Sequence, residues 1–231
     1  MGMRRNLIIH GGIYHPFAST SEVVAGILSD CDIETDMTTD VEAGLAALPD
    51  YDLLTVNALR WRMLDHPKYI PFRDRWAMTL SDPGRAAIEQ HVARGGAVLA
   101  LHTAVICFGD WPGWGNILGG RWAWGQSFHP PEQRVHVRVA APTHPICDGV
   151  EDFVVTDEIF HNLEPTAAWQ PLLSARATPE APEQPLCWTH ESGAGRVFYD
   201  ALGHTKSSLL NPAHRRLLTQ ATRWLLRMES V

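Results

Sequence analysis

The chain of 231 residues is long enough for one large domain, and 45% hydrophobic with 19% charged residues is a globular composition. The formal net charge is −7 and Lys and Arg are scattered, which argues against nucleic acid as a partner. No apolar run approaches the roughly 20 residues that span a bilayer, and the apolar stretch near the N-terminus is too short for a signal peptide. We therefore predict a cytoplasmic protein without membrane contact, folded as a single domain over residues 1–231.

In the N-terminal half, patterns typical of strands alternate with patterns typical of helices. Strands are predicted at 6–10, 33–38, 51–58 and 97–102, and helices at 20–29 (capped by Ser19 or Thr20), 41–48 and 83–94 (capped by Asp82). This alternation predicts a parallel sheet that is covered on both faces. Ligands bind at the carboxyl ends of such strands, so His10, Asn57 and His102 are expected at one edge, with Asn57 as a candidate substrate-binding residue.

Two stretches, 59–80 and 108–131, are irregular and rich in aromatic residues, and loops this long are often functional. Residues 135–140 alternate strictly and predict an antiparallel, half-exposed strand. Further strands are predicted within 153–161, 171–177, 185–190 and 193–205, and a last helix over 212–227 capped by Asn211.

Twelve histidines and nine tryptophans are many for this length, while four widely spaced cysteines without a C-x-x-C pair predict no disulfide framework. The stretch GGAVLALHTA (95–104) reads as a buried strand that ends at His102 before small residues. Several α/β hydrolases and amidotransferases hold a nucleophilic Ser or Cys at such a turn.

Five motifs carry a resemblance to a known family: YHP, GGAVLALHTA, WPGWGNILGGRWAWGQSFHP, HPICDGVEDFVVTDEIFH and GAGRVFYDALGHT. In order and spacing they resemble the ThuA-like family, named for trehalose utilisation, over nearly the whole chain. The resemblance implies the class I glutamine amidotransferase-like fold, which is a flavodoxin-like three-layer α/β sandwich with a mostly parallel central sheet. It also implies carbohydrate metabolism involving disaccharides or 3-keto sugars, without fixing the reaction.

The resemblance argues against glutaminase chemistry. Where amidotransferases have a cysteine, this chain has His102, and imidazole is a poor acyl nucleophile but a good metal ligand or general base. Cys107 lies five residues too late, and Lys206 stands where amidotransferases typically have a carboxylate two residues after the histidine. We therefore expect that the protein is not a glutamine amidotransferase.

The family motifs and the predicted strand ends select His15, His102, His129, Glu158 and His204 as site candidates. We predict that His15, His102 and His129 bind a divalent metal, zinc before others, and that His102, Glu158 and His204 are catalytic. The adjacent Asp157 and Glu158 side chains point apart in an extended chain, and the family pattern selects Glu158. A structural, hydrogen-bonded role remains open for each histidine. No nucleotide cofactor is expected, because no G-x-G-x-x-G or P-loop occurs.

Four tryptophans could stack on a sugar ring, or they could anchor a long loop to the core: Trp111, Trp114, Trp122 and Trp124. Five other histidines are expected on the surface: His66, His91, His136, His190 and His214.

Two functions follow from these predictions. The first is an enzyme of sugar catabolism that acts on a disaccharide or keto-sugar by metal-assisted or His/Glu-assisted hydrolysis or elimination. The second is a non-catalytic sugar-binding or regulatory protein that lacks the nucleophile of the scaffold. In either case the expected partner is a small-molecule sugar. A third possibility is a structural partner within a larger complex, in which loop 59–80 could make contacts, including self-association into a homo-oligomer.

Overall fold

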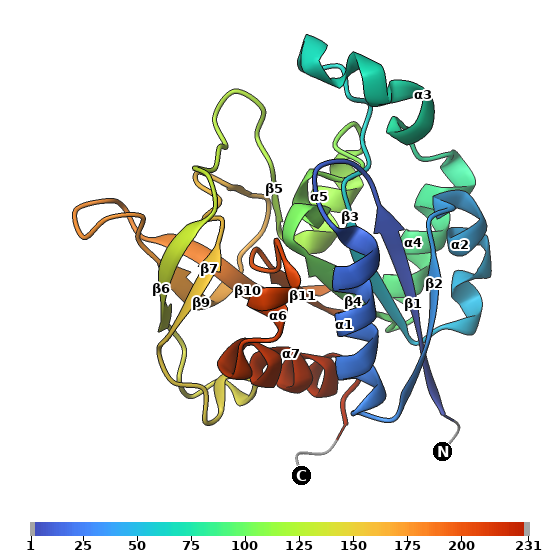
Figure 1. Ribbon diagram of the computed structural model, residues 1–231. Helices are drawn as coiled ribbons and strands as arrows, with labels where there is room; N and C mark the ends of the chain where they lie inside the picture. Colours follow the sequence, from blue (N-terminus) through green and yellow to red (C-terminus); the bar gives the residue numbers. More distant parts are fainter. Residues whose placement is uncertain (1–2, 229–231) are drawn as a thin grey trace.

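The computed structural model describes residues 3–228, and Figure 1 shows its helices packed around one large sheet. Five strands run parallel in the order β2-β1-β3-β4-β11. They are β1 (Arg4–Gly11), β2 (Ile33–Thr38), β3 (Leu53–Ala58), β4 (Ala97–Leu101) and β11 (Gly195–Asp200). Met1, Gly2 and Glu229–Val231 of the predicted domain lie outside the described residues.

The sheet continues beyond β11 with antiparallel strands in the order β10-β9-β6-β7. Their bounds are β10 (Gln184–Ser192), β9 (Gln170–Ala175), β6 (Gln133–Val139) and β7 (Phe153–Asp157). A separate two-stranded sheet pairs β5 (Gly120–Arg121) with β8 (Glu164–Pro165). The nine-stranded sheet is therefore mixed, with a parallel core as predicted.

Side-chain alternation along the strands explains the three layers. In β1, Leu7 and Ile9 pack into one hydrophobic cluster and Ile8 into the other, because successive side chains point to opposite faces. The first cluster is covered by α2 (Val41–Ala47), α4 (Asp82–Ala93) and α5 (Pro112–Leu118). The second is covered by α1 (Phe17–Ser29) and α7 (Pro212–Leu225), with the short α6 (Lys206–Leu209) beside them. The predicted flavodoxin-like α/β sandwich is confirmed.

The two irregular stretches contain short helices that the sequence patterns did not indicate. Residues 59–80 include a 3-10 helix (Pro67–Phe72) and α3 (Arg73–Trp76), and residues 108–131 include α5 and β5. Figure 1 shows that the segment with α3 rises above the carboxyl ends of the parallel strands.

Some helix starts differ from the prediction. Helix α1 begins at Phe17 instead of Thr20, and the hydroxyls of Ser19 and Thr20 donate to the Pro16 carbonyl rather than capping the helix. For α4 the capping side chain is Ser81, which accepts from the Gly84 N–H, and not Asp82. The Asn211 cap of α7 and the antiparallel, half-exposed strand β6 are confirmed.

Two histidines expected on the surface are buried. His91 Nε2 lies 2.9 Å from the Ala97 carbonyl oxygen, and His214 Nε2 lies 2.7 Å from Asp200 Oδ2. Both imidazoles therefore have buried hydrogen-bond partners, which makes their burial tolerable. His66 and His136 are exposed as expected, and His190 is half-buried.

Candidate metal centre

His102 stands directly after the end of β4 in a strained backbone conformation. Its φ is +49°, in the left-handed region that residues other than glycine rarely adopt. The Tyr199 hydroxyl donates to the His102 carbonyl oxygen at 2.8 Å and helps to hold this turn. The buried imidazole thus occupies a nucleophile-like position, as the sequence predicts.

Backbone carbonyls determine which ring nitrogens carry protons. His102 Nδ1 lies 2.6 Å from the Ala201 carbonyl oxygen, and His15 Nδ1 lies 3.1 Å from that of Ile13. A carbonyl oxygen only accepts, so both Nδ1 atoms carry the donated proton. An imidazole that is protonated at Nδ1 alone presents a lone pair at Nε2, and the two Nε2 atoms lie 3.2 Å apart.

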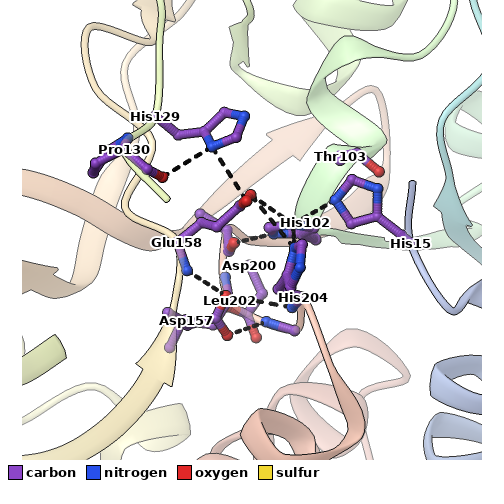
Figure 2. A network of polar contacts seen from close by, with 12 residues as sticks. His15, His102, Thr103, His129, Pro130, Asp157, Glu158, Asp200, Leu202 and His204 are labelled. Carbon is purple, nitrogen blue, oxygen red and sulfur yellow. Dashed lines mark hydrogen bonds and ion pairs between the residues drawn. The ribbon is translucent and has the colours of Figure 1, made fainter. Parts of the chain in front are cut away.

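A His/Glu group formed by His15, His102, Glu158 and His204 converges at this point, as Figure 2 shows. Their four ligand atoms all lie within 4.8 Å of one another. His102 Nε2 lies 3.2 Å from His15 Nε2, 3.3 Å from His204 Nδ1 and 3.4 Å from Glu158 Oε2. Ligand atoms of a tetrahedral zinc ion with bonds of about 2.0–2.1 Å lie about 3.3–3.4 Å apart, so the three separations from His102 Nε2 suit such an ion.

The Glu158 side chain is 8% exposed and is surrounded by imidazoles. Burial raises its pKa, but the adjacent His102, His129 and His204 lower it further, so the pKa lies well below its usual range. The carboxyl group is therefore ionised. Its buried Oε2 makes no hydrogen bond of good geometry within the described chain, although it lies 3.5 Å from His204 Nδ1.

The histidines of the site differ in their protonation. Burial, together with the charge of His102, lowers the pKa of His15 to about 3, so His15 is neutral. The adjacent Glu158 carboxylate raises the pKa of His129 and of His204. The lone pair of the neutral His15 and the anionic Glu158 carboxylate thus both face His102 Nε2, which is an arrangement that a cation would stabilise.

Asp157, which the sequence analysis set aside, supports this group from below. Its fully buried carboxylate accepts from the backbone N–H of Gly203 at 2.7 Å, of Glu158 at 2.8 Å and of His204 at 3.3 Å. Asp157 therefore fixes the backbone of two members of the His/Glu group. Two of these hydrogen bonds come from Gly203 and His204, which lie 46 and 47 positions away in sequence, so no local sequence pattern reveals this role of Asp157.

The structure brings the three predicted catalytic residues together with His15, but it does not place His129 in the His/Glu group. His129 Nδ1 lies 3.2 Å from the other carboxylate oxygen of Glu158, and its side chain is 40% exposed. Of the three predicted metal ligands, His15 and His102 belong to the group, and His129 lies beside it (Figure 2).

The predicted substrate-binding residues separate into two sets. Asn57 is buried and its amide donates to the hydroxyls of Thr20 and Ser21, both at 2.9 Å. Trp114 is 1% exposed and its indole donates to the Ala104 carbonyl oxygen, and Trp111 is buried as well. These three side chains therefore stabilise the fold and present no open face to a sugar. Trp122 and Trp124 are more accessible.

Trp122 and Trp124 belong to an aromatic row that starts at the His/Glu group. Successive ring centroids lie 5.5 Å (Phe160–Trp122), 6.1 Å (Trp122–Trp124) and 6.0 Å (Trp124–Trp61) apart. Phe160 itself packs 4.8 Å from the His102 ring. Trp61, from the 59–80 stretch, was not predicted as a site residue. Its stacking on Trp124 is a contact between two loops that are remote in sequence, and the sequence pattern of either loop does not indicate it.

Cys107 is not suited to act as a nucleophile. Burial raises the pKa of the Cys107 thiol to about 12, and the thiol donates to the Ala58 carbonyl oxygen. Lys206 is an exposed residue at the start of α6. All four cysteines, which lie in the described part of the chain, are free thiols.

Across residues 3–228, none of the helices has the length and apolar character that a membrane span requires.

Three solved structures illustrate what the chain is similar to. A ThuA-like protein from Parabacteroides merdae ATCC 43184 is 17% identical, with a TM-score of 0.78 over 100% of this chain and 93% of that one. A ThuA-like protein from Bacteroides uniformis ATCC 8492 is 19% identical, with a TM-score of 0.72 over 96% of this chain and 91% of that one. A Salmonella typhimurium LT2 protein, described as cytoplasmic, is 12% identical, with a TM-score of 0.67 over 95% of this chain and 99% of that one. At these identities the likeness shows the fold alone.

A search of curated proteins finds no match for this sequence. The family model ThuA, described as trehalose utilisation, matches residues 5–225, which is nearly the whole chain. Together with the nine-stranded sheet and the placement of the motif residues, this match shows that the chain belongs to the ThuA family of trehalose-utilisation-type proteins.

Proposed function

We propose that this protein is a metal-dependent enzyme of sugar catabolism, acting on a disaccharide or keto-sugar by hydrolysis or elimination. The observation that carries the proposal is the short separation of His102 Nε2, His15 Nε2 and Glu158 Oε2. His15 Nε2 presents a lone pair and Glu158 Oε2 a negative charge, so a cation that they share with His102 Nε2 would be stabilised here.

His15, His102, Glu158 and His204 would hold the ion, and zinc suits a set of three imidazoles and one carboxylate. A divalent ion held by these residues would provide Lewis acidity toward a carbonyl or hydroxyl oxygen of the sugar. The chain's own residues orient the ligands: the Ala201 and Ile13 carbonyls fix two imidazoles, and Asp157 fixes the backbone of the other two ligand residues.

His129 is the imidazole best placed to touch the sugar. It lies outside the His/Glu group, is 40% exposed, and is held through Nδ1 by Glu158. We assign it the task of holding or moving a proton at the ring edge that points away from Glu158 (Figure 2).

The test is turnover of α,α-trehalose and its 3-keto derivative by protein supplied with zinc or manganese. We expect His102→Ala and Glu158→Gln to reduce turnover by about 100-fold or more, because each removes a group that touches the ion. His129→Ala should reduce turnover while the protein retains its metal. His136→Ala, which changes an exposed histidine on β6, is the matched control. Unchanged turnover in His102→Ala would refute the proposal.

A non-catalytic sugar-binding protein is the second candidate, favoured by the replacement of the scaffold's nucleophile with His102 and by the inert Cys107. It predicts sugar binding by calorimetry without turnover and without a requirement for metal. A cytoplasmic location and a homo-oligomer remain predictions for either function.

A further inference from the structure

A second feature of the molecule suited to sugar lies at the outer end of the aromatic row. An open cavity of about 200 Å³ is lined by Trp61, Arg62, Leu64, Asp65, Gly109, Asp110 and Trp124. It joins the two long loops, since Trp61 and Asp65 come from residues 59–80 and Asp110 and Trp124 from residues 108–131. We call it the Trp61–Trp124 pocket.

The aromatic part of this pocket is preorganised. The Trp61 and Trp124 rings are stacked with an interplanar angle of 26°, and the Trp61 indole donates to Asp65 Oδ2 at 2.8 Å. Trp124 is nevertheless 41% exposed, so part of its surface remains open to a ligand. An exposed indole held in place by a neighbour binds with little loss of conformational entropy.

The polar part contains an unsatisfied acceptor. Asp110 Oδ1 is buried and has no hydrogen-bond partner in the described part of the chain, while Oδ2 lies 3.8 Å from Arg85. A buried acceptor left unpaired costs free energy, and a ligand hydroxyl that donates to it would remove this cost.

The charges of the pocket select the class of ligand. Aromatic rings with two carboxylates could in principle hold an organic cation. Here Arg62 lines the pocket beside Asp65, and Arg85 pairs with Asp110, so the carboxylates are offset by guanidinium groups. A neutral ligand with an apolar face and several hydroxyls fits this combination better, and a pyranose ring is such a ligand.

The pocket is also close to the His/Glu group. Trp122 separates the two, with its ring centroid 6.2 Å from that of His129 and 6.1 Å from that of Trp124. The buried Trp122 Nε1 also lacks a hydrogen-bond partner among the described residues, which leaves a donor between the two places. A single indole ring, that of Trp122, therefore lies between the Trp61–Trp124 pocket and the His129 imidazole beside the His/Glu group.

We propose that the Trp61–Trp124 pocket binds the second ring of a glycoside whose first ring lies at the His/Glu group. This assignment rests on the proposed function for the role of the first ring, but the pocket's affinity for sugar is testable without it. It makes the substrate a two-ring glycoside in preference to a monosaccharide.

The experiment records the indole N–H resonances of the ¹⁵N-labelled full chain during titration with α,α-trehalose, glucose or choline. Trehalose should bind more tightly than glucose and should shift the Trp61 and Trp124 resonances. Trp124→Leu and Asp110→Asn should each weaken trehalose binding about 3- to 10-fold, as expected for one stacking or hydrogen-bonding contact. Phe128→Leu is the control, because Phe128 is 52% exposed on the same loop but does not line the pocket.

Three results would overturn the proposal: no indole shift with either sugar, equal weakening by Trp124→Leu and Phe128→Leu, or a stronger response to choline than to trehalose. Titrations repeated in Glu158→Gln separate binding from turnover. If Trp124→Leu turns over substrate with the KM of the wild type, the pocket does not bind the substrate, and the proposed function is unaffected. If trehalose shifts the indole resonances but is not turned over, the pocket binds sugar as proposed, and the proposed enzymatic function is wrong.

Discussion

The His102 imidazole is held by different groups at its two nitrogens. Nδ1 donates to the Ala201 carbonyl oxygen on the β11 side, and Nε2 faces His15, His204 and Glu158. The strained backbone at φ +49° and the Tyr199 hydrogen bond fix the direction of the ring. A side chain restrained at backbone and ring is suited to be a ligand, because little entropy is lost when an ion binds.

At Asp157 we predict that substitution affects both stability and metal binding. Asp157→Asn replaces one acceptor oxygen by an NH₂ group that faces backbone N–H donors. We expect a loss of about 2–3 kcal/mol in the free energy of unfolding, measured in urea without metal. We also expect a 10- to 100-fold weaker metal affinity, measured by competition with a chelator.

The matched control is Asp152→Asn, since Asp152 accepts from the Val139 N–H in an exposed position far from the His/Glu group. It should cost about 1 kcal/mol or less and leave metal affinity unchanged. An Asp157→Asn variant with wild-type metal affinity would show that this carboxylate does not position the ligands.

Among the elements, α7 depends on its N-cap residue, Asn211. Asn211 Oδ1 accepts from the Ala213 and His214 N–H groups, and its Nδ2 donates to the Val154 carbonyl oxygen of β7. We expect Asn211→Ala to cost about 1–2 kcal/mol in urea unfolding, because both the cap and the cross-link are lost. Asn211→Asp retains the cap and should recover about half of this loss. Equal losses in the two variants would contradict the capping role.

The elements also show what the sequence could predict. Hydrophobic alternation and caps such as Asn211 located most strands and helices, because these signals are local. The start of α1 at Phe17 and the short helices of residues 59–80 depend on tertiary packing. At the site, motif positions selected His15, His102, Glu158 and His204, whereas Asp157 and Trp61 act through contacts with residues far away in sequence.

For the whole molecule, the buried His214–Asp200 pair predicts a pH dependence of stability. Burial lowers the pKa of His214, but the charge of Asp200 and the hydrogen bond to it raise the pKa further, above its ordinary value. A histidine with a raised folded pKa contributes stability that is complete below the unfolded pKa of about 6.5 and is lost as pH rises through the folded pKa.

The measurement is the free energy of unfolding in urea at pH 6 and pH 9, for wild type and for the double variant Asp200→Asn/His214→Gln. The variant keeps two hydrogen-bonding groups but cannot titrate. The wild type should therefore lose more stability than the variant between the two pH values. Parallel pH profiles would show that the pair does not carry a proton in the folded state.

We propose that His15, His102, Glu158 and His204 together form one metal centre. The most direct measurement is the stoichiometry and affinity of zinc for metal-free protein, with cobalt as a spectroscopic substitute. We predict one equivalent of zinc per chain, and visible absorption of four-coordinate cobalt, both lost in His102→Ala and Glu158→Ala and retained in His129→Ala. Zinc or cobalt binding that is absent in the wild type, or that survives in His102→Ala, would contradict the account.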